Sequence, residues 1–138
     1  IFQMSEKETK ELQKYFSATY SDDSFGTDTI KGFLDNGYLM DPHTATCIKA
    51  YKELKDKPLK TVIYSTAEWT KFSPTVLNAL NKNQIKYSDK QALEEISSKY
   101  NATLPQSIKE LFNAKINHSL VIEKENIEVE IVKFIRES

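Results

Sequence analysis

Two neutral hydroxyl side chains, Ser65 and Thr66, stand together at the end of an apolar run in the stretch TVIYSTAEWTKFSP. If residues 61–66 form a strand, these hydroxyls lie at its carboxyl end, which is where ligands bind in open α/β sheets. They suit a neutral heteroatom or a phosphate oxygen, because they donate and accept hydrogen bonds without carrying charge. Nucleophilic catalysis is not indicated, since no glycine elbow surrounds Ser65 and no histidine is close in sequence. The alternative is that both hydroxyls only satisfy backbone groups where the chain leaves the sheet.

A second candidate motif is Asp41-Pro42-His43-Thr44, which follows Gly37 by a few residues. It is typical of a helix start: Asp41 accepts backbone hydrogen bonds as the N-cap, and proline occupies the first helical position. That structural role explains the motif without a further function. His43 adds a titratable ring, but no acidic or cysteine partner stands at ligand spacing from it. We therefore predict no metal site.

The composition indicates one globular domain with a hydrophobic core. The 138 residues are 39% hydrophobic and 28% charged, and the 19 basic side chains nearly balance the 20 acidic ones. Arg136 is the single arginine, so neither nucleic acid nor a membrane surface is an expected partner. One cysteine excludes an internal disulfide and fits a reducing compartment. Without an apolar run of roughly 18 residues or a signal-peptide pattern, the expected location is cytoplasmic.

Capped amphipathic runs predict that most of the chain is helical. The expected helices start at Ser5, before Ile30, at Asp41, at Ser73, at Ser88, at Pro105 and near Ile127. The first is expected to carry Leu12, Tyr15, Phe16 and Tyr20 on one face and to end at a polar turn, residues 21–26. The tail is ambiguous: residues 127–131 alternate like a strand, but the longer window to 135 fits a helix, which we predict.

Residues 61–66 are the one segment with a clear strand pattern, and both of its faces are apolar. A lone strand leaves its backbone N–H and C=O groups unpaired, because a ladder needs a neighbour. Either other strands escape detection or a missing part of the polypeptide completes the sheet. The chain starts at Ile1 rather than methionine, which favours the second explanation. We expect an α/β architecture: a mostly helical fragment that contributes a strand and flanking helices to a larger sheet.

The stretch GYLMDPHTATCIKAY, followed by VIYSTAEWTKF, resembles the C-terminal region of threonine synthase. That family consists of pyridoxal-phosphate enzymes of fold type II, the tryptophan synthase β group. The resemblance covers residues 4–80, and the remaining tail is only loosely similar. The residues that match the family's two motifs are Asp41, Pro42, His43, Thr44, Ala45, Ser65, Thr66, Ala67, Lys71 and Phe72.

The resemblance implies that Thr66 faces the pyridine nitrogen of pyridoxal 5'-phosphate and that Ser65 helps to shape the ring pocket. A neutral hydroxyl would leave that nitrogen largely unprotonated. It also implies that Asp41, His43, Thr44 and Lys71 lie near the active-site cleft, without assigning them a chemical role. No catalytic residue is expected in this chain, because the family's Schiff-base lysine and glycine-rich phosphate loop lie in its N-terminal part. The family's histidine after Ser-Thr-Ala is replaced by Glu68, to which we transfer no role.

By the same resemblance, residues 1–80 would be the C-terminal part of the cofactor-binding α/β domain and residues 81–138 a helical tail. The whole enzyme would convert O-phospho-L-homoserine and water to L-threonine and phosphate. The fragment alone, without the N-terminal part of its polypeptide, is expected to be inactive. One alternative is another fold-type-II enzyme, a dehydratase or a relative of cysteine synthase. The other is a non-catalytic helical interaction module, which a closed core with a polar skin would favour over exposed apolar surface.

Overall fold

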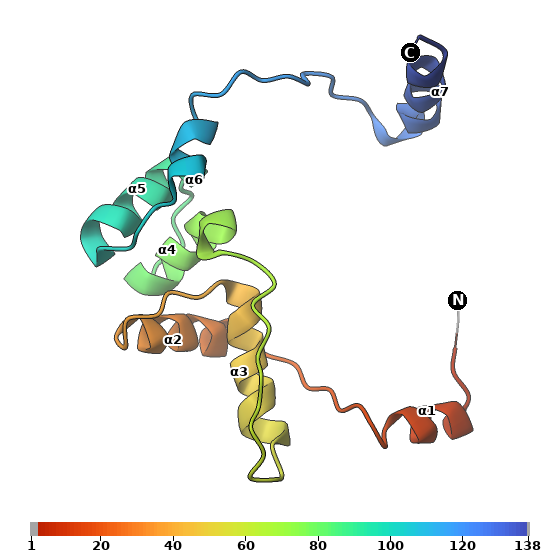
Figure 1. Cartoon of the computed structure of the whole chain (residues 1–138), viewed down its shortest axis with the longest axis vertical. Helices are drawn as coiled ribbons and strands as arrows, with labels where there is room; N and C mark the ends of the chain where they lie inside the picture. The colour runs from red at the N-terminus through yellow and green to blue at the C-terminus, as the bar shows by residue number, and fades with distance from the viewer. Residues whose placement is uncertain (1–2, 138) are drawn as a thin grey trace.

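The computed structural model describes residues 3–137, which form helices joined by irregular segments (Figure 1). The α-helices are α1 (Glu6–Leu12), α2 (Asp23–Leu34), α3 (Pro42–Leu54), α4 (Ser73–Asn81), α5 (Asp89–Tyr100), α6 (Gln106–Leu111) and α7 (Ile127–Glu137). The short 3-10 helices are η1 (Trp69–Phe72) and η2 (Lys124–Asn126). The prediction of a mostly helical chain is confirmed. Ile1, on which the expected truncation rested, lies outside the described residues.

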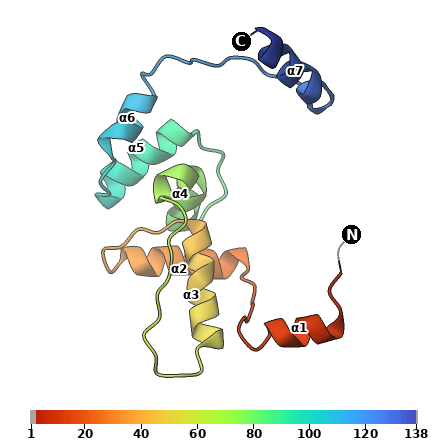
Figure 2. The ribbon, with the colours of Figure 1, turned by 45° about the vertical axis from the view of Figure 1, so that its right-hand side comes forward.

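Helices α2 to α5 pack together into the core of the molecule (Figure 2). Helix α4 lies at its centre, because it contacts both α2 and α5 and buries five of its nine residues. The fully buried apolar side chains include Ile30, Met40, Ala45, Val76, Leu77, Ala92, Leu93 and Ile96. This core therefore draws on residues from both sides of position 81, where the expected division of the chain falls. Helices α1 and α7 stand away from it, at the ends of extended segments.

Local capping signals predicted the helix starts well. Ser5 and Ser88 each form a complete capping box, and Asp41 caps α3 with Pro42 in the first turn. The helix predicted for the tail is confirmed as α7. The expected turn at residues 21–26 is instead largely helical, because the Asp22 side chain accepts a hydrogen bond from the Phe25 N–H and starts α2 there.

The first helix is shorter than its pattern suggests. It ends at Leu12, so Tyr15, Phe16 and Tyr20 do not share its face and are 77%, 69% and 87% exposed. A short helix is marginal in water without a surface to pack against, and α1 buries none of its residues.

The strand predicted at residues 61–66 does not form, and the described residues contain no strand. The segment instead runs back beside α3 (Figure 1). A strand needs a neighbour to bond with, and no second extended segment lies alongside this one within residues 3–137. Val62 and Tyr64 are therefore 75% and 80% exposed, while Ile63 turns inward against the core.

Candidate functional site

The start of α3 carries a buried carboxylate. Asp41 is 1% exposed, and its Oδ1 accepts hydrogen bonds from the backbone N–H of His43 at 2.9 Å and of Thr44 at 3.3 Å. Its Oδ2 accepts a third from the Thr44 hydroxyl. Burial opposes ionisation of this carboxyl, but the hydrogen bonds from Thr44 and His43 outweigh it and hold the Asp41 pKa below its ordinary value. Asp41 is therefore an anion over the whole physiological pH range.

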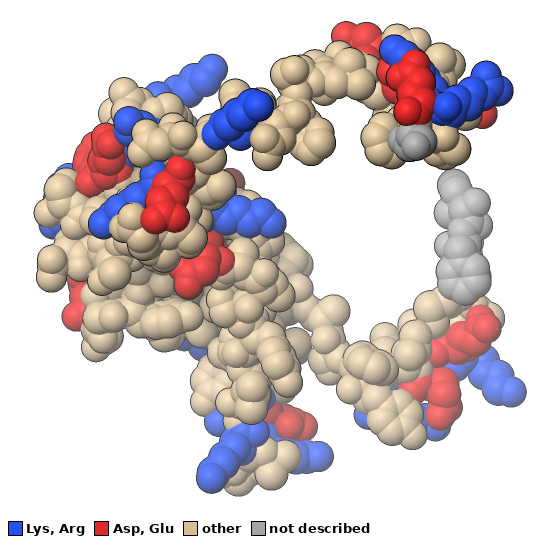
Figure 3. Space-filling view, turned by 45° about the horizontal axis from the view of Figure 1, so that its top comes forward, with Lys and Arg blue, Asp and Glu red and all other residues tan. Residues whose placement is uncertain are grey.

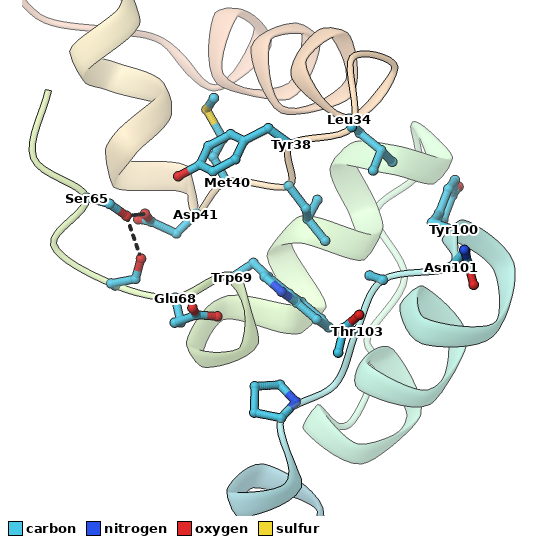
Figure 4. Close-up of a pocket in the computed structure, with 15 residues that line it drawn as sticks. Leu34, Tyr38, Met40, Asp41, Ser65, Glu68, Trp69, Tyr100, Asn101 and Thr103 are labelled. Atoms are coloured by element: carbon cyan, nitrogen blue, oxygen red, sulfur yellow. Dashed lines mark hydrogen bonds between the residues drawn. The ribbon is translucent and has the colours of Figure 1, made fainter.

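The two sequence motifs meet at this carboxylate. The Ser65 hydroxyl lies 3.4 Å from Asp41 Oδ2, although the two residues are 24 positions apart (Figure 4). Thr44 Oγ1 is 3.2 Å from Ser65 Oγ, which also donates to the Ala67 carbonyl at 2.9 Å. The rings of His43 and Phe72 make a second contact between the motifs, with centroids 4.7 Å apart. The tertiary structure thus brings two motifs into contact that are well separated in the sequence.

A cleft of about 540 Å³ opens beside this contact. Three segments line it: the turn after α2 up to Asp41, residues 65–69 excluding Thr66, and residues 100–105 after α5. Figure 4 shows Asp41 and Ser65 on one wall, Glu68 and Trp69 on a second, and Asn101 and Thr103 on a third. Within the part of the chain that the structure describes, no lysine, arginine or histidine lines the cleft, so it offers hydroxyls and carboxylates rather than a cradle for phosphate.

Thr66 lies outside this cleft, in a neighbouring groove of about 740 Å³. The groove is bounded by α3 on one side and by residues 55–64 on the other, and Cys47, Ala50 and Tyr51 form part of its wall. The Thr66 side chain is exposed and makes no hydrogen bond within the described part of the chain. Its hydroxyl is therefore available to a ligand, whereas the Ser65 hydroxyl is already engaged.

The other predicted site residues sit around these hollows rather than in them. Thr44 is buried behind Asp41. The His43 side chain is 62% exposed, and its Nδ1 lies 3.4 Å from Asp41 Oδ1. Lys71 lies on η1, exposed, with its Nζ 5.4 Å from the centre of the Phe72 ring. None of the three lines the cleft or the groove.

Sequence reasoning missed the third wall of the cleft, residues 100–105. One local signal was present: Asn101 follows the apolar run of α5 and takes the left-handed conformation that ends helices, with φ 53°. That signal predicts a turn of the chain. It could not have predicted that the turn returns to Trp69 and Asp41, because this depends on how α4 and α5 pack.

The residues present can be tested against pyridoxal 5'-phosphate, which the resemblance implies. A free threonine hydroxyl fits a pyridine nitrogen, so Thr66 can serve one edge of the ring. The chain has three glycines, and the one with positive φ, Gly37, lies in the turn before Asp41. Lys55, Lys57 and Lys60 also line the groove, so positive charge is present there without a glycine-rich phosphate loop. The donor set therefore fits the nitrogen side of the cofactor.

The fold and the site describe a helical chain. In it the N-cap of α3, Asp41, contacts the turn that carries the Ser65 and Thr66 hydroxyls. No protein-family model matches the chain. It is 30% identical over 105 residues, 75% of its length, to the human protein named threonine synthase-like 1, and equally so to that of Pongo abelii. The mouse protein of that name is 36% identical over 70 residues, 51% of the chain.

These similarities relate the chain to threonine synthase-like proteins, which confirms the predicted resemblance at that level. The chain spans only 14% of the length of the human relative and 9% of the mouse relative. No helix among residues 3–137 is both long enough and apolar enough to cross a membrane. On the face drawn in Figure 3, acidic and basic side chains are intermixed without a broad patch of one sign.

Proposed function

We propose that this chain is the C-terminal part of a pyridoxal-phosphate enzyme of fold type II with threonine synthase activity. The whole enzyme would convert O-phospho-L-homoserine and water to L-threonine and phosphate. The observation that carries the proposal is the contact between Asp41 and Ser65, because it unites in space the two motifs on which the resemblance rests. The relatives named threonine synthase-like 1 support the same assignment.

When bound, pyridoxal phosphate would supply an electron sink for the amino-acid substrate. Thr66 would place its neutral hydroxyl against the ring nitrogen and so leave that nitrogen largely unprotonated. An aspartate at position 66 would instead hold a proton there. Ser65, tied to Asp41 and Ala67, would hold the turn beside the ring in one conformation.

The exposed apolar surface favours a part of a larger enzyme over a self-contained interaction module. Leu59, Val62 and Tyr64 are 65%, 75% and 80% exposed along the segment beside α3. Exposed apolar residues that gather on one segment mark a surface made for a partner. We propose that the N-terminal part of the same polypeptide covers it and supplies the Schiff-base lysine, so that residues 1–138 alone would be inactive.

The test uses the full-length protein. With added pyridoxal 5'-phosphate, the wild type should show the long-wavelength absorbance band of bound cofactor, and it should release phosphate and form threonine from O-phosphohomoserine. Thr66→Val should shift or weaken the band. Thr61→Val is the matched control, because Thr61 lines the same groove but precedes the hydroxyl pair.

Two outcomes would contradict the proposal. A full-length protein that binds no cofactor would show that the resemblance does not extend to chemistry. A protein that binds cofactor but leaves O-phosphohomoserine unchanged would belong with the dehydratases or cysteine synthases of the same group.

A further inference from the structure

We propose that Asp41 is a positioning residue: its buried carboxylate holds Ser65 and thereby turns the adjacent Thr66 hydroxyl toward the groove along α3. This inference rests on the proposed function, which assigns Thr66 to the cofactor. Asp41 itself would not touch the cofactor or the substrate. It would act through the conformation of residues 65–67.

Asp41 differs from the other helix caps in its burial and in how far along the chain it reaches. Ser5, Asp22 and Ser88 are exposed, and their side chains bond within three residues of themselves. Asp41 is buried and reaches Ser65, 24 residues along the chain. Burying a carboxylate costs free energy that capping alone does not require. Among the described side-chain caps, Asp41 is the one that connects its helix to a distant segment.

The Ser65 hydroxyl is held by groups from two segments. Two acceptors lie within reach of its single proton, the Ala67 carbonyl oxygen at 2.9 Å and, at the longer distance of 3.4 Å, Asp41 Oδ2. Thr44 Oγ1 lies 3.2 Å from the Ser65 oxygen, and its own proton is shared between Ser65 and Asp41 Oδ2. Three groups thus surround one hydroxyl. This arrangement restrains the rotation of the Ser65 side chain and the backbone that carries it.

The neighbours Ser65 and Thr66 face two different hollows. Ser65 lines the cleft with Asp41, and Thr66 lines the groove with α3. The two residues are adjacent in the chain, so the backbone conformation that places Ser65 in the cleft also sets the direction of the Thr66 side chain. A Ser65 hydroxyl held against Asp41 leaves the Thr66 hydroxyl facing the groove.

The experiment compares four variants of the full-length protein. Asp41→Asn keeps a good N-cap but puts an amide where the charged acceptor stood. Ser65→Ala leaves the cap intact and removes the hydroxyl. Asp22→Asn is the matched control, because Asp22 caps α2 without contacting residues 65–67. Thr66→Val reports on the proposed function itself.

Two quantities are measured: the Kd for pyridoxal 5'-phosphate by absorbance titration, and amide hydrogen exchange of residues 65–69 without cofactor. Asp41→Asn and Ser65→Ala should each raise the Kd by about three- to tenfold, the effect of losing one ordinary hydrogen bond. Both should also speed exchange at residues 65–69. Asp22→Asn should change neither quantity.

The inference is overturned if Asp41→Asn and Ser65→Ala match Asp22→Asn in both measurements. If Asp41→Asn fails to fold, Asp41→Ser takes its place, because serine keeps a good N-cap but lacks the second carboxylate oxygen that faces Ser65. A Thr66→Val variant with the wild-type Kd would overturn the assignment of Thr66, and with it this inference. Loss of binding in Thr66→Val, together with unchanged Asp41→Asn and Ser65→Ala variants, would overturn the role of Asp41 only.

Discussion

The imidazole ring of His43 packs against the phenyl ring of Phe72, with centroids 4.7 Å apart and planes inclined at 53°. The contact joins the start of α3 to the end of η1 on the solvent side, since the His43 side chain is 62% exposed. The half-buried Asp41–Ser65 contact joins the same two motifs on the inner side. The turn that carries Ser65 and Thr66 is therefore held on both sides.

A double-mutant cycle with His43→Ala and Phe72→Ala tests whether this ring contact stabilises the chain. The coupling energy in urea unfolding should be about 0.5–1 kcal/mol, as for other exposed aromatic pairs. Each single substitution also removes contacts with other residues, such as the packing of Lys71 over Phe72. The cycle subtracts these contributions and leaves the coupling between the two rings. Strictly additive effects would show that the rings lie together without stabilising each other.

The pH dependence of stability should reveal the buried carboxylate. The Asp41 pKa in the folded chain lies below its ordinary value of 3.8, so its contribution is complete above that value and is lost as the pH falls below it. The difference in unfolding free energy between wild type and Asp41→Asn should shrink as the pH falls below about 4. Glu8, Asp22 and Glu53, whose pKa values are also lowered, affect both proteins equally. A difference that does not change with pH would contradict the assigned pKa shift.

Helix α5 should prove to be part of the core rather than of a separate tail. Ile96 is fully buried, so Ile96→Ala should lower the unfolding free energy by about 2–5 kcal/mol. Ile116, which is 79% exposed, provides the matched control, and Ile116→Ala should change it by less than about 0.5 kcal/mol. Thermal or urea unfolding measures both. If Ile96→Ala and Ile116→Ala both changed the unfolding free energy only slightly, the stable core would be confined to α2, α3 and α4.

Two glycines should respond in opposite directions to the same substitution. Gly37 has a φ of +83° in the turn before Asp41, so Gly37→Ala should destabilise the chain by about 1 kcal/mol. Gly32 lies in α2, where an added methyl group would meet no atom within 4 Å, so Gly32→Ala should stabilise the chain by about 0.5–1 kcal/mol. Melting temperatures of the two variants on either side of the wild type would confirm this. A stable Gly37→Ala variant would show that the turn adopts another conformation.

The sequence by itself determined where most helices begin. Capping boxes at Ser5 and Ser88 and the Asp41-Pro42 start act through hydrogen bonds within a few residues, so they can be recognised without knowing the fold. The resemblance of two short motifs to threonine synthase identified Asp41, Thr44, Ser65 and Thr66 as candidates.

Only the tertiary structure decided what those candidates do together. Residues 61–66 have the composition of a strand but no neighbouring strand to bond with among residues 3–137, so they run beside α3 as an irregular segment. The contact of Asp41 with Ser65, and the separation of Ser65 from Thr66 into two hollows, depend on how α3 packs against that segment. Long-range packing of this kind leaves no periodic signal in the sequence, because each partner's position is set by the rest of the core.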